Sequence, residues 1–178
     1  MQREFTTRRK REEGFSLLEM LFATIILLVG LVAVAQLVPS SITMNSRNRG
    51  DSAALVLAQR ELDQMLDQKL TAPAFTDTQG NNCLLGDSTA PNQIVGNPVI
   101  LDASGRPVID FAAGQVTGYN FQRADPSDPS GAFFDVRWAV ITSVNGATIT
   151  GKRFILGVRQ QGGNGFFQPI TLDTTVER

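Results

Sequence analysis

The spacing of apolar residues divides the chain into a uniformly apolar helix, an amphipathic helix and a series of short strands. Between positions 15 and 38 the polar exceptions are few: Ser16, Glu19, Thr24 and Gln36. A helix of this length spans about 36 Å, and the hydrocarbon core of a bilayer is about 30 Å thick. Because apolar residues cover all sides of the helix, the segment is predicted to span a membrane.

Two helix-weakening residues lie along this run, Gly30 in its interior and Pro39 at its outer end. In a helix interior Gly costs roughly 1 kcal/mol relative to Ala, and Pro costs roughly 3 kcal/mol. Two interpretations follow. The first takes the residues as a softened segment that bends or unwinds when helices pack together, and the second takes them as residues without a special role, because Gly and Pro are frequent in membrane-spanning helices. Beyond Pro39, residues 40–49 form a polar interfacial stretch, and Gly50 is predicted to break the helix.

A second helix is predicted from Ala53 to Leu70, with Asp51 and Ser52 as its N-terminal cap. Its apolar residues recur on one face: Leu55, Ala58, Leu62, Met65 or Leu66, and Leu70. Such a stripe requires a cover, and a sheet formed by the rest of the chain is the natural one. A coiled coil would need more heptads than this length offers.

Residues 71–98 are rich in Thr, Asn, Gly, Asp and Pro and are predicted to form a long loop. After this loop the apolar period becomes that of strands. Strands are predicted at 99–101, 108–111, 116–123, 133–142, 152–160 and 168–176. The first two are predicted to pair as a hairpin around 102–107. The strand at 133–142 alternates large apolar with charged or small residues and is predicted to be central, with 152–160 as its partner after an Asn-Gly turn.

The basic residues before the span predict its orientation. The first 13 residues carry Arg3, Arg8, Arg9, Lys10 and Arg11, whereas only Arg47 and Arg49 follow soon after the span. By the positive-inside rule the leader lies in the cytoplasm and the head lies outside it. No Ala-x-Ala pattern is present at 37–41, so the run is not expected to be removed as a secretory signal.

Composition narrows the possible functions of the 178-residue chain. After residue 13 there are 11 basic and 14 acidic side chains, so direct nucleic-acid binding is not predicted. The chain has no histidine, which excludes the common zinc sites and His-based catalytic triads. Cys83 is the only cysteine, cannot form an internal disulfide, and is predicted to be a tolerated small residue in a loop. No catalytic residue, metal or cofactor is predicted.

Glu19 is the anomaly of the apolar run. A carboxylate at mid-membrane costs about 2.5 to 3.5 kcal/mol on insertion scales, although a position near the helix end costs less. One interpretation is an interfacial acid favoured by the helix macrodipole. The other is a carboxylate paired with a cation from a partner, because buried opposite charges are tolerated together.

The block Gly14-Phe15-Ser16-Leu17-Leu18-Glu19, preceded by a basic leader and followed by the apolar helix, resembles the N-terminus of type IV pilins and pseudopilins. The resemblance implies that a prepilin peptidase cuts between Gly14 and Phe15 and methylates the new amine of Phe15. It also implies that Glu19 meets the amino terminus of a neighbouring subunit during filament assembly. Glu12 and Glu13 depart from the family pattern and could slow processing.

The same resemblance implies an α+β fold in which a long N-terminal helix packs on a small antiparallel sheet. The expected segments are a cytoplasmic leader at 1–14, a transmembrane and assembly helix at 15–39, an amphipathic helix at 40–70 and a periplasmic β-rich head at 71–178. The expected partners are the prepilin peptidase, other pilin or pseudopilin subunits, the inner-membrane assembly machinery and the lipid bilayer. The expected location is the inner membrane, single-pass, and then an extracellular filament.

Several alternatives stay open beside this interpretation. A short resemblance of the Val-Arg-Trp strand and the following Lys-Arg-led strand to PilV-type minor pilins suggests a minor pilin. A pilus, a type II secretion pseudopilus and a DNA-uptake filament share this N-terminus. From a different class, a single-span anchored periplasmic binding or enzymatic domain would also fit the span.

Minor chemical alternatives are weaker than structural explanations of the same residues. Asp125, Asp128 and Asp135 could hold calcium, but their Asp-Pro steps are ordinary turn formers and the spacing is not an EF-hand. The glycines at 162–165 lack the Lys-Ser/Thr of a phosphate-binding loop. The aromatic residues of the head could be adhesive, but strand aromatics usually belong to the core. These residues are Tyr119, Trp138, Phe166 and Phe167.

Overall fold

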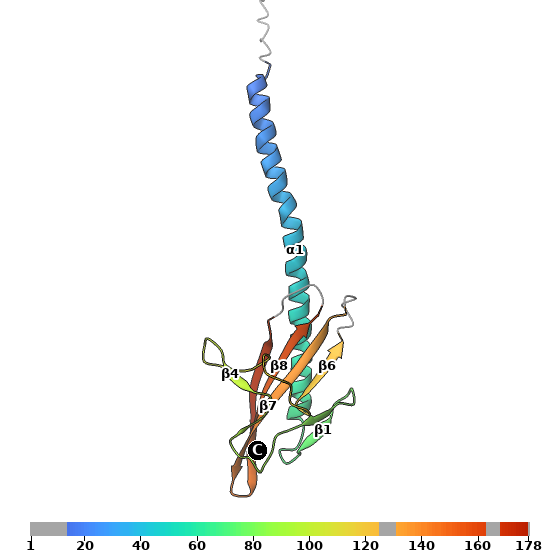
Figure 1. Ribbon diagram of the computed structural model, residues 1–178, viewed down its shortest axis with the longest axis vertical. Coiled ribbons are helices and arrows are strands. Elements are labelled where there is room, and N and C mark those ends of the chain that lie inside the picture. Colours follow the sequence, from blue (N-terminus) through green and yellow to red (C-terminus); the bar gives the residue numbers. More distant parts are fainter. Residues whose placement is uncertain (1–13, 125–130, 163–167, 178) are drawn as a thin grey trace, which may run out of the picture. The chain divides into compact units, whose positions relative to one another are not determined.

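The computed structural model describes residues 14–124, 131–162 and 168–177. Contacts divide the chain into two units, Met1–Asn45 and Ser46–Arg178, and the helix α1 (Leu17–Leu66) begins in the first unit and ends in the second (Figure 1). Ser46–Arg178, the head, contains the end of α1 and all nine strands found in the described residues. The long helix and the antiparallel strands confirm the predicted α+β fold.

In the described part of the first unit, every side chain from Gly14 to Asn45 is exposed. Phe15, for example, is 85% exposed. Among the described residues α1 is the one helix that is long and apolar enough to cross a membrane. An apolar helix exposed on all sides is stable only in apolar surroundings, such as lipid or other helices.

The predicted break at Gly50 is wrong, because α1 passes through Pro39 and Gly50 without interruption. One Gly in a helix costs roughly 1 kcal/mol, whereas ending a helix requires a second, unfavourable nucleation event. Ser52 does not cap a new helix: its hydroxyl donates to the carbonyl of Asn48 at 2.7 Å. The helix also ends at Leu66, four residues before the predicted end.

The main sheet of the head has five antiparallel strands. Its strands are β3 (Ile94–Gly96), β6 (Asn120–Ala124), β7 (Phe133–Asn145), β8 (Thr148–Gln161) and β9 (Ile170–Glu177). Their order is β3-β7-β8-β9, and β6 also pairs with β7. The sequence prediction that the strand at 133–142 is central and pairs with the next strand is confirmed.

Two small hairpins accompany this sheet: β1 (Ala74–Thr76) with β2 (Asn82–Leu84), and β4 (Val99–Leu101) with β5 (Pro107–Ile109). The second hairpin was predicted, and Gly105 has the positive φ of 78° that its turn requires. The first hairpin and β3 lie within residues 71–98, where the sequence predicted a loop. A strand of three residues is too short to show a recognisable alternation of apolar and polar residues. Whether such a segment forms a strand depends on its pairing in the tertiary structure.

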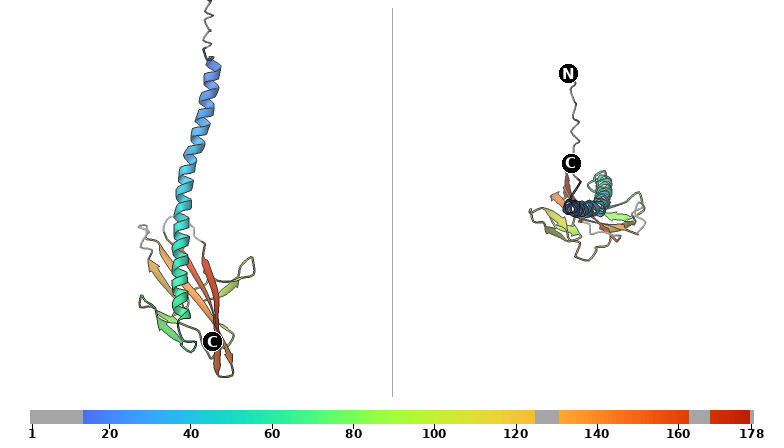
Figure 2. Two further views of the ribbon diagram at one scale, coloured as in Figure 1. Left: turned by 180° about the vertical axis from the view of Figure 1, so that it is seen from behind. Right: turned by 90° about the horizontal axis from the view of Figure 1, so that it is seen from above.

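The head part of α1 packs on one face of the sheet, behind the strands in Figure 1 and in front of them in Figure 2. Trp138 is fully buried in this layer, and its indole nitrogen donates to the carbonyl of Leu84 at 2.9 Å. The rings of Tyr119 and Phe121 lie 6.1 and 6.0 Å from the Trp138 ring. These aromatic residues therefore belong to the core and are not an adhesive surface.

The stripe that α1 buries contains the predicted Ala58, Leu62 and Met65 but differs from the prediction at other positions. Leu55 is 37% exposed, whereas Ala54, Leu57 and Glu61 face the sheet and are buried. The burial of Glu61 was not predicted, because a glutamate is rarely fully buried. Burial raises the pKa of the Glu61 carboxyl, and the nearby negative charge of Asp77 raises it further.

The β4–β5 hairpin and the segment after it cover the opposite face of the sheet. Ile109 and Phe111 pack there against Ala139 and Ile155. A Cβ on Gly157 would lie 2.9 Å from atoms of both Ile109 and Phe111, so only glycine allows this close approach. Both faces of the sheet are therefore covered, which the alternating pattern of β7 did not predict.

Candidate functional site

The N-terminal segment is the candidate site, and its local geometry begins with Ser16. The Ser16 hydroxyl accepts a hydrogen bond from the backbone N–H of Glu19 at 3.2 Å, and its carbonyl accepts one from Met20 at 3.1 Å. Ser16 is thus the N-cap of α1, and Glu19 is the third residue of the first turn. Ser-x-x-Glu is the sequence of a capping box, so the role of Ser16 was readable from the sequence although it was not predicted.

The Glu19 carboxylate lies on the exposed surface of the first helical turn. In the part of the chain that the structure describes, no hydrogen bond or ion pair is made by its oxygens. The macrodipole favours a negative charge at this end of a helix. The geometry supports the interpretation of Glu19 as a helix-start acid and leaves its carboxylate accessible to a partner.

Gly14 and Phe15 precede the helix in an exposed segment without regular secondary structure. A Cβ built on Gly14 meets no atom within 4 Å, and Gly14 has no positive φ. The fold therefore does not require glycine at this position. A requirement for glycine would have to come from another molecule that approaches the backbone closely.

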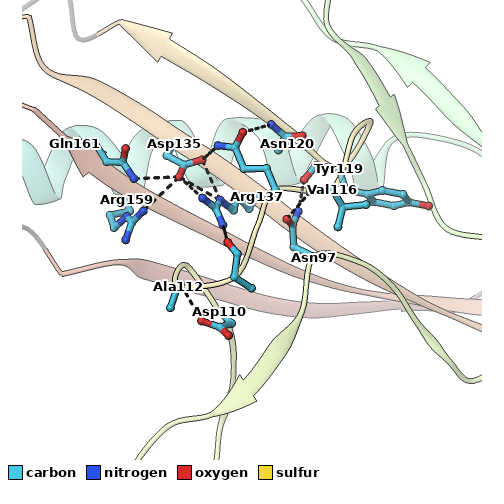
Figure 3. Close-up of polar contacts among 12 residues, drawn as sticks. Asn97, Asp110, Ala112, Val116, Tyr119, Asn120, Asp135, Arg137, Arg159 and Gln161 are labelled. Atoms are coloured by element: carbon cyan, nitrogen blue, oxygen red, sulfur yellow. Dashed lines mark hydrogen bonds and ion pairs between the residues drawn. The ribbon is translucent and has the colours of Figure 1, made fainter.

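In the head, the most prominent polar cluster surrounds Asp135 and is shown in Figure 3. Asp135 is fully buried and forms an ion pair with Arg137, whose Nη2 lies 2.9 Å from its Oδ2. Arg159 lies 3.5 Å from the same oxygen, and Gln115 and Gln161 donate to the carboxylate at 3.1 and 3.2 Å. All the bonding capacity of the carboxylate is directed to its own chain, so the cluster is structural.

The two arginines of this cluster also hold the covering segment against the sheet. Their guanidinium carbons lie 5.0 Å (Arg137) and 4.7 Å (Arg159) from the centroid of the Phe111 ring. Arg137 also donates to the carbonyl of Ala113 at 2.8 Å. The cluster therefore joins strands β7 and β8 to the segment after β5 by cation–π contacts and hydrogen bonds.

Asp135, one of the three aspartates suggested as calcium ligands, is not available to bind an ion. Asp135 is engaged by arginines, and Asp125 and Asp128 lie outside the described residues, as do Phe166 and Phe167. In residues 14–124, 131–162 and 168–177, no group of three or more Asp, Glu or Cys side chains is placed to bind a metal ion.

Cys83 lies in strand β2 and is fully buried, so its assignment to a loop is corrected. Burial is the main cause that raises the pKa of its thiol to about 12, and the negative charges of Asp77 and Glu61 contribute to the same shift. Because the thiolate is the nucleophile, Cys83 is inert in the folded head.

We expect native protein at neutral pH to resist alkylation by iodoacetamide at Cys83, and denatured protein to be alkylated rapidly. Intact-mass measurement with and without urea tests this. Equal labelling rates in the two states would contradict the burial of the thiol.

Comparison with known proteins adds one match. Residues 9–35 match the family described as the prokaryotic N-terminal methylation motif. No curated protein and no solved structure was found to match the chain. The match contains Gly14, Phe15, Ser16 and Glu19 and most of the apolar run. It does not test the narrower resemblance to PilV-type minor pilins, which stays a prediction. The N-terminal segment of the chain therefore carries the prokaryotic N-terminal methylation motif, which supports a relationship to type IV pilins and pseudopilins.

Proposed function

We propose that the chain is a minor pilin or pseudopilin that a prepilin peptidase cleaves after Gly14, methylates at Phe15, and releases for assembly into a filament. The observation that supports this most directly is the first turn of α1. There, a single exposed carboxylate, Glu19, follows an unconstrained Gly14-Phe15 bond and begins a helix whose side chains are exposed on all sides as far as Asn45. The proposed segments are the leader at 1–14, the span at 15–39, its continuation at 40–70 and the β-rich part of the head at 71–178.

Cleavage before Phe15 would create an amine two residues before the first turn of the helix. A cation and a carboxylate are each costly in apolar surroundings, and they are tolerated when they pair. The amine of one subunit and the Glu19 carboxylate of its neighbour supply such a pair. The apolar helix would hold the subunit in the inner membrane, with its head on the periplasmic side, before assembly and would pack against neighbouring helices afterwards.

Replacing Glu19 by alanine is expected to leave membrane insertion intact and to reduce incorporation into filaments at least about tenfold, since a lost charge pair in apolar surroundings costs several kcal/mol. The measurement is the amount of this chain in the sheared filament fraction relative to the membrane fraction. Gln36→Ala is the matched control, because it removes an exposed polar side chain from the same helix without removing a charge. Ser16→Ala separates the carboxylate from the cap: it weakens the helix start by about 1 kcal/mol and keeps Glu19.

Filament incorporation of Glu19→Ala equal to that of Gln36→Ala would remove the pairing role. Equal loss in Ser16→Ala and Glu19→Ala would assign the effect to the helix start.

A further inference from the structure

The five-stranded sheet of the head has two borders that carry no further strand in the described residues. β9 pairs along its length with β8 and with no second strand. On the other border, β3 and β6 pair only with β7. The outer backbone groups of an edge strand are available to pair with another chain, so both borders are candidate contact surfaces.

The directions of the strands decide which borders can meet. β8 is antiparallel to both β7 and β9, so β9 runs parallel to β7. β3 is antiparallel to β7 and therefore runs opposite to β9. A second head placed beside the first in the same orientation would therefore bring its β3 against β9 as an antiparallel pair.

A symmetric contact between two β9 strands would have the opposite consequence. Antiparallel pairing of β9 with itself requires a two-fold axis, which reverses one head and turns the Ser46 ends of the two α1 helices in opposite directions. Copies anchored in one membrane through residues before Ser46 need those ends to point the same way. A repeat that keeps the orientation is heterologous, and such interfaces continue into open filaments.

The register of the sheet also fits this contact. Thr174 pairs with Phe154, which pairs with Val140, which pairs with Val95. A sideways shift of one head therefore sets Thr174 opposite Val95. The flanking residues then oppose Asp173 to Gly96 and Thr175 to Ile94, so no like charges meet.

The side chains on these two strands favour the pairing. β3 carries no charge, and the one charge opposite it, Asp173, is already paired with Arg153. Ile94 is 51% exposed in the single head and would be covered by the neighbour. Beside β9, a groove of about 620 Å³ between Thr171, Asp173 and the β4–β5 hairpin leaves room for side chains of an incoming strand on that face.

We propose that heads of two copies join edge to edge in the same orientation, β9 of one copy against β3 of the next. This inference rests on the proposed function, because the shared orientation comes from anchoring in one membrane. Neighbouring strands are rotated by about 20 to 25°, so repeated contacts would wind around an axis. The contact adds backbone hydrogen bonds between heads to the packing of the N-terminal helices.

The test is disulfide cross-linking of the full-length chain in membranes. The variant Ile94→Cys, Thr175→Cys places one thiol on each border, at exposed positions that do not disturb the core. Opposed residues in an antiparallel pair have Cβ atoms about 4.5 to 5.5 Å apart, close enough for a disulfide after small adjustment. Mild oxidation is expected to give a ladder of dimers and larger species on non-reducing gels.

The matched control is Ile94→Cys, Thr171→Cys, which uses the same strands and face with a displacement of about 13 Å along β9. We expect roughly tenfold less cross-linked product from the control, because the thiols exceed disulfide reach. Equal ladders from both pairs, or a dimer from Thr175→Cys alone, would overturn the proposed contact. The absence of cross-links in protein whose mass shows a normal Phe15 terminus would overturn this contact and leave the proposed function standing, whereas a retained leader would count against the function itself.

Discussion

Valine in place of Gly14 is expected to leave the leader attached to nearly all of the protein and to abolish its assembly. The folded chain tolerates the change, because a Cβ at Gly14 meets no atom within 4 Å and Gly14 lies outside α1. The branched side chain would instead obstruct the close approach of a peptidase to the scissile bond. Intact-mass measurement of the membrane-bound protein distinguishes the full-length chain from a mature form that starts at methylated Phe15.

Gly30→Val is the matched control for this prediction. Gly30 also has no atom within 4 Å of a built Cβ, and it lies inside α1, away from the scissile bond. It is expected to give normally processed protein. A mature Phe15 terminus in the Gly14→Val variant would contradict the assignment of the cleavage site. Loss of processing in both variants would show that the effect comes from a change in the helix.

Removing the Asp135 side chain is expected to be the most destabilising of the single changes proposed for the head. Asp135→Ala leaves Arg137, whose side chain is 6% exposed, as a buried charge without its counterion. Breaking a buried ion pair in this way typically costs about 3 to 5 kcal/mol. Urea unfolding of the purified protein, followed by the fluorescence of Trp138, measures the loss.

Asp173→Ala provides the matched control, because Asp173 also pairs with an arginine across neighbouring strands but does so at the surface, where the two side chains are 41% and 31% exposed. Exposed pairs contribute about 0 to 1 kcal/mol, so a much smaller loss is expected. The double variant Asp135→Leu, Arg137→Met should recover part of the stability, since apolar replacement of a buried pair is often neutral, whereas Arg159 still loses the carboxylate. Equal losses from Asp135→Ala and Asp173→Ala would contradict a structural role for the buried pair.

Much of the fold was predictable because its signals are local. The span follows from the length of the apolar run, and the pairing of β7 with β8 follows from the alternation on each side of an Asn-Gly turn. That pairing continues to Asn145 and Thr148, on either side of Gly146. The candidate site was equally readable, because Gly14, Phe15 and Glu19 lie within six consecutive residues.

The incorrect predictions concern features that local sequence does not encode. Gly50 was expected to break a helix that in fact continues, since the weak propensity of one glycine is outweighed by the continuity of the helix around it. Of the three short strands in 71–98, only β3 pairs with a distant strand, β7. Strands β1 and β2 pair with each other as a hairpin, and at three residues each they are too short to show a recognisable period.

The sequence alone was sufficient to predict a membrane-anchored subunit that is cleaved near its N-terminus, because the motif, the apolar run and the first helical turn depend on neighbouring residues. It was not sufficient to show that Glu61, Asp135 and Arg137 are buried, because charged side chains ordinarily face water and only packing can supply their partners. Nor could it reveal that β9 and β3 border the sheet in opposite directions, because strand order depends on pairings between residues far apart in the chain. The tertiary structure decided these features.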